Sequence, residues 1–282
     1  VQKGLQSMAN FTAADVKKLR EDLGAGMMDA KNALVEADGD YDKAVELLRI
    51  KGAKAVAKRD DRATSEGVVV ATSENGAATV VELASETDFV AKNEKFTTLA
   101  DKVLGAVAAA GAADVAAANA APLDGKTVLE VVNESSAALG EKLEVRTVRR
   151  VEGSAFEIYL HKTSQDLPPQ IAVVIAYEGD NAAEARSIAQ HVAFANPTYL
   201  TRDEVPAEAI EKERATVEAI TREEGKPEAA LPKIVEGRVN AYIKQVSLLD
   251  QDYAKDNKIS VAKAAENAGI TIQGFARVKV GA

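Results

Sequence analysis

The chain of 282 residues contains no cysteine and no tryptophan, and aromatic residues make up only 4% of it. The lack of cysteine excludes disulfides, thiolate metal sites and cysteine nucleophiles, and it is consistent with a reducing cytosol. Since large aromatic side chains are scarce, the cores must be built from Ala, Val, Leu and Ile, which favours helices and small sheets.

Long apolar runs are absent as well. No stretch reaches the about 18 consecutive apolar residues that a membrane-spanning helix needs. The nearest candidate, residues 107–121, is rich in alanine and is interrupted by Gly111 and Asp114. No signal peptide is visible, and residues 1–7, ahead of Met8, read as additions to the native sequence. We therefore expect a cytoplasmic protein that makes no contact with a membrane.

Positive charge is in short supply, because 35 Lys and Arg residues face 44 Asp and Glu residues and leave a net charge of −9. Broad nucleic-acid binding needs a basic face that releases counterions, so this balance argues against a direct nucleic-acid partner. The acidic surplus favours a protein partner instead. With 46% hydrophobic and 28% charged residues, the chain has room for two or more packed units.

Residues 8–62 predict a small helical domain. Thr12 and Asp15 have the spacing of a capping box, and a Gly-Ala-Gly segment ends the first helix. A second helix over residues 27–37 and a third that begins after Asp40 complete a three-helix bundle. The bundle resembles a ubiquitin-associated (UBA) domain, and a basic linker follows it.

Two adjacent methionines, Met27 and Met28, lie at the turn between the first two of these helices. A thioether side chain can fill an irregular gap in a core or serve as an adaptable contact on a surface. We expect one of the two to face the core and the other to be exposed.

Beyond residue 63 the apolar residues change from helical to alternating spacing, which predicts strands. Two strand-like runs flank Asn75-Gly76, a pair typical of a tight hairpin turn. Two series of elements follow, each with strands, a helix and a closing strand: residues 66–72, 78–83, 96–110 and 142–151, then 156–161, 171–177, 181–194 and 271–280. We predict an α+β fold with two small antiparallel-sheet subdomains related by a weak internal repeat, core subdomain N (63–153) and core subdomain C (154–198 plus 237–282).

Residues 199–236 predict a helical hairpin inserted into core subdomain C. Four of the seven prolines in the chain lie in or beside it, at Pro197, Pro206, Pro227 and Pro232. Apolar residues form a narrow seam with coiled-coil character. The first helix contributes Ile210, Val217 and Ile220, and the returning helix contributes Val235, Val239, Tyr242, Ile243 and Val246. Such a seam can pair within one chain or between two, so a homodimer or a 2:2 complex with a partner stays open.

One segment resembles the end of a phosphate-binding loop, Gly125-Lys126-Thr127. Such a loop follows a buried strand and opens a helix, so that its N–H groups converge on phosphate. Here an Ala-rich helical segment precedes it, and Pro122 removes one donor. A nucleoside triphosphatase is therefore a disfavoured alternative.

Two further patterns also fail as sites. Asp38, Asp40 and Asp42 resemble the start of a calcium loop, but the glycine and the final glutamate that the loop needs are missing. The only histidines, His161 and His191, have no Ser and Asp or Glu at the spacing of a catalytic triad. An interface or a structural role is the better interpretation for both.

The segment 86–94 reads Glu-Thr-Asp-Phe-Val-Ala-Lys-Asn-Glu and joins a predicted strand to a predicted helix. A turn of this kind presents the bulky Phe89 next to the carboxylate of Asp88, with charges on either side. That arrangement suits a wedge pushed into another protein better than a small-molecule pocket. The alternative is that Phe89 simply packs into the core, as a lone phenylalanine at the start of a helix often does.

Two long motifs in this order resemble the signatures of the elongation factor Ts family: Leu-Arg-Glu-Asp-Leu-Gly-Ala-Gly-Met-Met-Asp-Ala-Lys at 19–31, and residues 82–92 with Thr-Asp-Phe-Val-Ala-Lys. The resemblance continues through Gly140-Glu141-Lys142, both histidines and the segment 225–227, and it covers residue 8 to about residue 280. It implies a guanine-nucleotide exchange factor for elongation factor Tu, without covalent chemistry and so not an enzyme in that sense.

The resemblance also implies a site. Thr87, Asp88, Phe89 and Val90 would form the motif that dislocates magnesium from the partner, with the phenyl ring between two helices of its GTPase domain and the carboxylate supporting the shift. The protein would have no cofactor of its own and would act on GDP and magnesium bound to elongation factor Tu. One departure from the family pattern is Ala84, where an asparagine is common.

Further contacts with the partner are implied by the same family pattern. Arg20, Met27 and Met28 would touch the GTPase domain, and a second contact region would comprise Leu139, Gly140, His161 and His191. The alternative function from another class is a UBA-type module that binds a peptide or ubiquitin through about the first 50 residues, which leaves most of the chain without a role.

Overall fold

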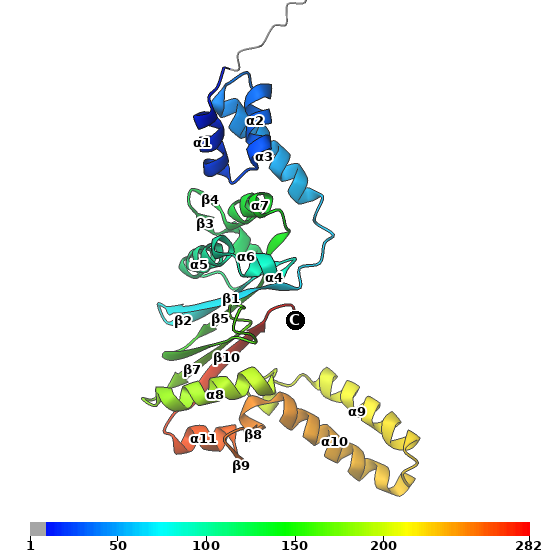
Figure 1. Ribbon diagram of the computed structural model, residues 1–282. Coiled ribbons are helices and arrows are strands. Elements are labelled where there is room, and N and C mark those ends of the chain that lie inside the picture. Colours follow the sequence, from blue (N-terminus) through cyan, green and yellow to red (C-terminus); the bar gives the residue numbers. More distant parts are fainter. Residues whose placement is uncertain (1–9) are drawn as a thin grey trace, which may run out of the picture.

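The computed structural model describes residues 10–282. The predicted boundary between residues 1–7 and the native start lies outside the described residues. Figure 1 shows a helical unit at one end, two small sheets in the middle, and a helical hairpin that projects from the body. Within residues 10–282 no helix is long and apolar enough to cross a membrane.

The N-terminal unit consists of α1 (Ala13–Leu23), α2 (Met27–Glu36) and α3 (Tyr41–Ala57). The predicted capping box is present, since the Thr12 side chain accepts from the Asp15 N–H and the Asp15 carboxylate accepts from the Thr12 N–H. Gly24 ends α1 in the left-handed conformation with a φ of 61°. The three predicted helices and their caps are therefore confirmed.

The prediction that one of the two methionines faces the core is wrong. Met27 is 54% exposed and Met28 is 62% exposed. The buried side of α2 is filled by Ala30, Ala33 and Leu34, and the methionines lie in the first turn of α2, outside the core of the three-helix unit. Both thioethers are therefore free to contact a partner.

Two three-stranded antiparallel sheets form the middle of the molecule. The first has the order β1-β2-β5 and the second the order β10-β7-β6, where the strands are β1 (Glu66–Glu74), β2 (Ala77–Ser85), β5 (Leu143–Glu152), β6 (Ala155–His161), β7 (Ile171–Glu178) and β10 (Thr271–Lys279). Asn75 and Gly76 turn the first hairpin with φ angles of 51° and 76°, as the sequence predicts. The mixed α+β class is thus confirmed.

The internal repeat extends further than the sequence indicated. In each half a hairpin is followed by a long helix, a short hairpin, another helix and a closing strand. The first half uses α5 (Glu94–Ala109), β3 (Pro122–Leu123), β4 (Lys126–Thr127) and α7 (Val128–Leu139), with α6 (Val115–Ala120) added after α5. The second half uses α8 (Ala182–Ala195), β8 (Asp252–Tyr253), β9 (Asp256–Ser260) and α11 (Val261–Asn267).

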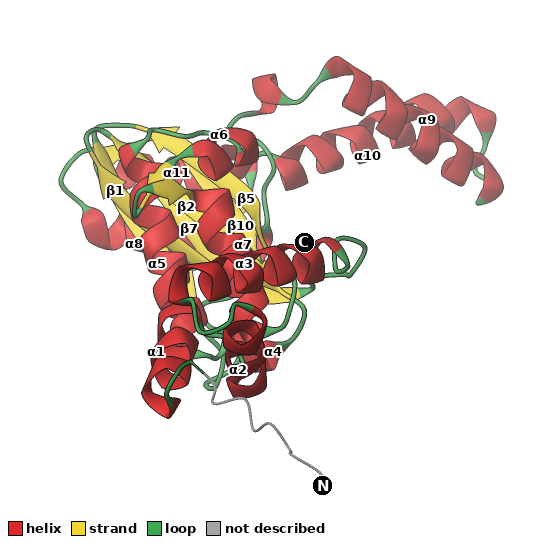
Figure 2. Ribbon diagram, turned by 90° about the horizontal axis from the view of Figure 1, so that it is seen from above, coloured by secondary structure: helices red, strands yellow, loops and turns green. Residues whose placement is uncertain are grey.

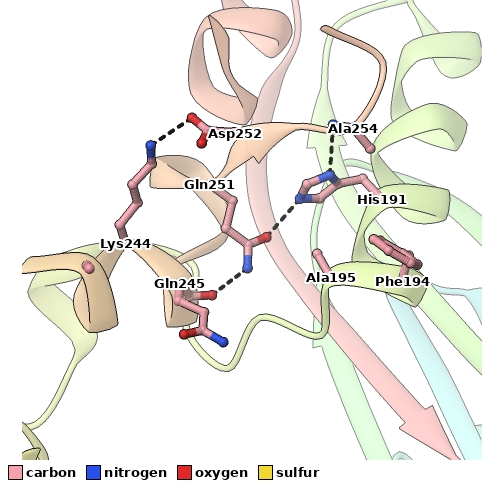
Figure 3. A pocket seen from close by; sticks show the side chains of 9 residues that line it. His191, Phe194, Ala195, Lys244, Gln245, Gln251, Asp252 and Ala254 are labelled. Carbon is pink, nitrogen blue, oxygen red and sulfur yellow. Dashed lines mark hydrogen bonds and ion pairs between the residues drawn. The ribbon is translucent and has the colours of Figure 1, made fainter. Parts of the chain in front are cut away.

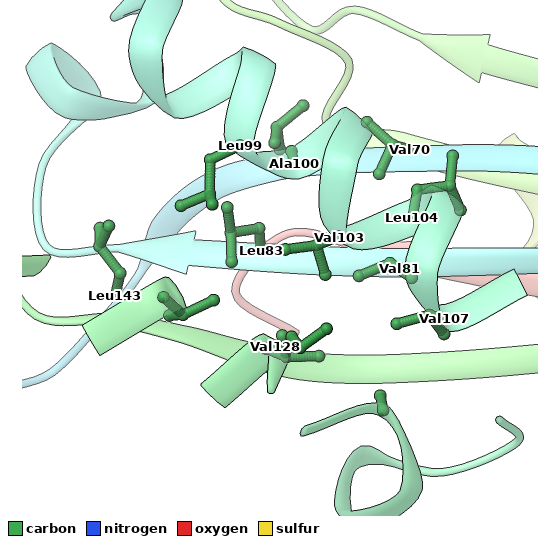
Figure 4. Close-up of a cluster of buried hydrophobic side chains, with 14 of the residues drawn as sticks. Val70, Val81, Leu83, Leu99, Ala100, Val103, Leu104, Val107, Val128 and Leu143 are labelled. Carbon is green, nitrogen blue, oxygen red and sulfur yellow. The ribbon is translucent and has the colours of Figure 1, made fainter. Parts of the chain in front are cut away.

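The two sheets pack face to face, and helices cover their outer faces (Figures 1 and 2). Val69 and Val80 of the first sheet meet Val174 and Val278 of the second in a buried cluster. On the outer face of the first sheet, side chains of α5 and α7 lie over β2 and β5, as Figure 4 shows for Leu83, Leu99, Val103, Val128 and Leu143. The order of layers is therefore helix, sheet, sheet, helix.

The inserted hairpin consists of α9 (Ala207–Glu223) and α10 (Leu231–Val246), with the short 3₁₀ segments Arg202–Glu204, Glu228–Ala230 and Leu248–Asp250 around it. Because α10 continues to Val246, the predicted limit at residue 236 falls inside this helix. At the base of the hairpin, the N–H groups of Thr198 and Tyr199 both donate to the Val246 carbonyl at 2.9 Å. The entering and leaving chains therefore run side by side where they meet the body.

The seam of the hairpin differs from its prediction at Ile220, which is 46% exposed. Its place is taken by Thr221, which is fully buried and lies four residues after Val217. The Thr221 hydroxyl donates to the Val217 carbonyl at 2.5 Å and accepts from Arg238 at 3.1 Å, which satisfies it inside the seam. Sequence spacing alone favoured the apolar neighbour.

The N-terminal unit docks on α7 through small residues. A Cβ atom added at Gly24 would lie 2.8 Å from the Ala138 Cβ, and one added at Gly52 would lie 3.2 Å from the Ala137 Cβ. An ion pair of 2.9 Å between Arg49 and Glu134 flanks this contact. Since a side chain at Gly24 would clash with Ala138, the close contact depends on this glycine and holds the helical unit on α7, above the first sheet (Figure 1).

Candidate functional site

The chain between β2 and α5 forms a short turn in which exposed and buried side chains are neighbours. Its centre is the single helical turn α4 (Asp88–Ala91), with Thr87 as N-cap. Phe89 is 81% exposed, whereas the next residue, Val90, is 9% exposed and packs into the core of the first sheet. The alternative that Phe89 is a core residue is therefore wrong, because the buried positions are taken by Val90 and Ala91.

Two glutamates fix this turn to the end of α7. The Glu141 carboxylate accepts from the Thr87 N–H at 3.0 Å and from the Thr87 hydroxyl at 2.5 Å. The Glu86 carboxylate accepts from the Lys142 N–H at 2.6 Å and from Arg62 at 3.2 Å. Partial burial alone would raise the pKa of Glu86, but these hydrogen bonds outweigh it and lower that pKa.

Sequence reasoning did not identify Glu86 and Glu141 as functional residues. Glu86 begins the segment 86–94 but had no role of its own there. For Glu141 the only signal was the Gly140-Glu141-Lys142 segment, which belongs to the family resemblance, and Glu141 lies 54 residues from Thr87. The structure also places Ala84, where the family pattern often has asparagine. It is fully buried in β2, and the following turn is held by Ser85, whose hydroxyl donates to the Thr87 carbonyl at 3.0 Å.

Asp88 forms an ion pair with Lys92 one helical turn later, at 2.6 Å. The hydrogen bond from Lys92 holds the pKa of the Asp88 carboxyl below its usual range, so the group stays ionised. Both side chains remain partly exposed. The exposed phenyl ring is thus flanked by a carboxylate and an ammonium group that already neutralise each other, which limits the charge that docking must desolvate.

Two of the predicted contacts of the N-terminal unit share a cleft with the start of α5, the helix that follows this turn. Arg20 and Met27 line a cleft of about 690 Å³ together with Lys95, which is in the first turn of α5, directly after the Phe89 turn. Met28 is exposed at the same end of α2. The structure therefore groups the α1–α2 turn with the segment that follows the Phe89 turn.

The four residues predicted to form a second contact region do not cluster. Leu139 packs against the core of the first sheet, and Gly140 ends α7 with a φ of 82°, next to Glu141. His161 lies at the end of β6, where its Nδ1 is 2.9 Å from the Tyr159 hydroxyl. His191 is buried in α8 on the second sheet. Leu139 and Gly140 therefore belong with the Phe89 turn rather than with the histidines.

His191 is held in one tautomer by two partners (Figure 3). The Ala254 N–H donates to His191 Nδ1 at 3.2 Å, so the proton must be on Nε2, which donates to the Gln251 side-chain oxygen at 2.8 Å. The side chain is only 4% exposed, and this burial lowers the pKa of His191 below its ordinary value. The ring is therefore a neutral, satisfied group.

A cavity of about 380 Å³ lies beside His191, between α8 and the C-terminal end of α10, where the inserted hairpin returns to the body (Figure 3). Phe194, Lys244 and Gln245 are among its lining residues. Phe194 is 87% exposed, more than any other large hydrophobic residue in the described part of the chain. The apolar spacing of α8 did not predict this exposure, because Phe194 directly follows three buried residues, His191, Val192 and Ala193.

Replacing His191 with glutamine is expected to flatten the pH dependence of stability. The folded-state pKa lies below the unfolded value of 6.5, so the unfolded chain binds the proton first as the pH falls. The contribution of the neutral, buried His191 ring to the free energy of unfolding is fully present above pH 6.5 and declines below it. Free energies of unfolding measured at pH 7.5 and 5.5 should therefore differ more for the parent than for His191→Gln. Equal differences would show that this ring does not resist protonation.

The segment Gly125-Lys126-Thr127 does not form a phosphate-binding loop. Gly125 turns the short β3–β4 hairpin with a φ of 78°. Lys126 is engaged by Glu134 at 2.5 Å, and Thr127 caps α7, with its N–H and hydroxyl both bonded to Glu130. The Lys126 side chain and the N–H and hydroxyl of Thr127 are thus used inside the protein.

Comparisons with known proteins agree with the motifs. A family model described as "Elongation factor TS" matches residues 86–282. The chain is 62% identical to the Elongation factor Ts of Clavibacter michiganensis over 275 residues, which is 98% of this chain and 100% of that protein. It is 58% identical to the Elongation factor Ts of Leifsonia xyli over 276 residues and 53% identical to that of Micrococcus luteus over 277, with 98% and 97% of this chain and 100% of each relative covered.

Proposed function

The chain belongs to the elongation factor Ts family, and from that premise we propose that it binds elongation factor Tu in its GDP form and promotes release of the nucleotide. It acts in protein synthesis in the cytoplasm, makes and breaks no covalent bond, and needs no cofactor of its own. Its targets are the GDP and the magnesium ion held by the partner. The observation that carries the proposal is the phenyl ring of Phe89, 81% exposed on a turn fixed from both sides.

In this proposal Phe89 enters between two helices of the partner's GTPase domain and displaces the magnesium site, and Asp88 supports the shift. Thr87 and Val90 hold the ring in place, one as the N-cap of α4 and the other as its anchor in the core. Binding shifts the partner only by as much as it favours the distorted state. Burial of one phenylalanine contributes about 1.5–3 kcal/mol, and each tenfold gain in rate needs about 1.4 kcal/mol.

Other contacts must supply the remaining free energy. We propose that Arg20, Met27 and Met28 touch the GTPase domain, since all three are exposed and the first two share a cleft with Lys95 of α5. Leu139 and Gly140 support the same contact from the end of α7. We assign a second contact to His161 and to the cavity beside His191, where Phe194 adds an exposed aromatic side chain.

We also propose the division into domains. The UBA-like unit spans residues 8–62, core subdomain N spans 63–153, and core subdomain C spans 154–198 together with the segment after the inserted hairpin. The hairpin itself extends to Val246, where α10 ends. Ile220 is exposed on its outer side and offers a site for pairing with a second copy, which would give a homodimer or a 2:2 complex.

The direct test is release of fluorescently labelled GDP from elongation factor Tu, measured with and without the chain. We expect faster release at amounts of the chain well below those of elongation factor Tu, because an exchange factor is recycled. An unchanged rate would refute the proposal. The alternative, a UBA-type module, predicts instead that residues 10–57 bind ubiquitin or a peptide, which titration calorimetry would detect.

A further inference from the structure

The Phe89 residue is 81% exposed, so little of its ring is held by neighbouring side chains and its direction depends on the backbone that carries it. That backbone is the single helical turn α4, which contains only four residues. A helical turn of this length is not stable by itself, because forming the first turn fixes several residues for one hydrogen bond. Whatever holds the N-terminal end of α4 therefore also holds the ring.

The N-cap Thr87 uses its hydroxyl in two directions. The oxygen accepts from the Val90 N–H at 3.4 Å, and the hydroxyl proton is donated to Glu141 at 2.5 Å. A threonine hydroxyl has one proton and two lone pairs, so directing its proton to Glu141 leaves a lone pair to face the helix. Glu141 also accepts the Thr87 N–H, which fixes the backbone that enters the turn.

Glu141 is itself fixed. Its carbonyl accepts from the hydroxyl of Ser136, a fully buried residue of α7, at 2.5 Å. The Ser136 carbonyl accepts from Arg59 at 3.0 Å, and Gly140 ends the helix in the left-handed conformation. In the part of the chain that the structure describes, no cationic side chain forms an ion pair with the Glu141 carboxylate. Within the described residues, the hydrogen bonds of this carboxylate go to Thr87 alone.

We propose that Glu141 is a positioning residue for nucleotide exchange, which it promotes by holding the Thr87 cap and thereby the direction of Phe89. This inference rests on the proposed function, because it concerns the same exposed ring. The carboxylate does not touch the partner in this mechanism. It pre-organises the turn, so that docking does not first have to order it.

The test is the maximum rate of labelled-GDP release at saturating concentrations of the chain, measured for the full chain. Glu141→Ala should lower this rate about tenfold, less than the roughly hundredfold that a misplaced group can cost, because the ring itself is still present. Glu141→Gln should lower it by only about threefold, since an amide oxygen can still accept the Thr87 N–H. The concentration that gives half-maximal rate should change less than twofold in both variants.

Glu130 provides a matched control within α7. It makes the same contacts with Thr127, accepting the N–H at 2.8 Å and the hydroxyl at 3.1 Å, but at the other end of the helix. Glu130→Ala should lower the thermal midpoint while leaving the maximum rate within twofold of the parent. An equal loss of rate in Glu130→Ala and Glu141→Ala would overturn the proposal, because the effect would then reflect the stability of α7.

A double-mutant cycle decides whether Glu141 acts through the ring. In the Phe89→Ala background, Glu141→Ala should reduce the rate by less than twofold, because there is no ring left to direct. If both substitutions together multiply their separate effects, Glu141 acts elsewhere and the proposal is refuted. If Phe89→Ala alone leaves the rate unchanged, the wedge in the proposed function has failed, whatever Glu141 does.

Discussion

Replacing Phe89 with alanine should lower the maximum rate of stimulated GDP release by about 10- to 100-fold, because burial of the ring contributes about 1.5–3 kcal/mol to distortion of the partner. The thermal midpoint should stay the same, since the ring is 81% exposed and contributes nothing to the core. Rapid-mixing fluorescence with labelled GDP measures the rate, and a melting curve of the chain alone measures the stability.

Phe194 supplies the matched control for this experiment. It is also a highly exposed phenylalanine, at 87%, but it lies on α8 beside the second sheet. Phe194→Ala should raise the concentration needed for half-maximal stimulation and leave the maximum rate close to that of the parent. If both alanine variants lose maximum rate equally, the ring of Phe89 has no special role in the exchange step, and the proposed wedge is wrong.

Phe96→Ala should have the opposite pattern of effects. Phe96 lies seven residues after Phe89 and is fully buried between α5 and the first sheet. Removal of such a side chain leaves a cavity and typically lowers the free energy of unfolding by about 3–5 kcal/mol. Chemical denaturation followed by circular dichroism should show this loss in the transition that contains the first sheet. A loss below about 1 kcal/mol would mean that the core collapses around the gap.

Features that depend on neighbouring residues could be predicted from the sequence. The Thr12–Asp15 capping box, the hairpin turn at Asn75-Gly76 and the end of α1 at Gly24 all follow from local backbone preferences. The turn around Phe89 was predicted for the same reason, since a strand pattern ends and a helix pattern begins there. These signals need no knowledge of what packs against them.

Features that depend on distant contacts could not be predicted. Burial of Thr221 in place of Ile220 depends on Arg238, which satisfies the hydroxyl from the other helix. The link between Glu141 and Thr87 spans 54 residues, and nothing in the composition of either segment reveals it. The apolar residues of α8 have the spacing of a helix that is covered by its neighbours. The exposure of Phe194 depends instead on how α8 ends against those neighbouring elements.

The paired backbones at the base of the α9–α10 hairpin have a consequence for how this architecture can vary. Thr198 and Tyr199 are hydrogen-bonded to Val246, so the two ends of the inserted hairpin lie next to each other. A hairpin that is joined to the body in this way can be lengthened, shortened or exchanged for a tight loop without altering the order of the strands. Protein engineering can therefore treat the hairpin as an interchangeable module on an unchanged scaffold.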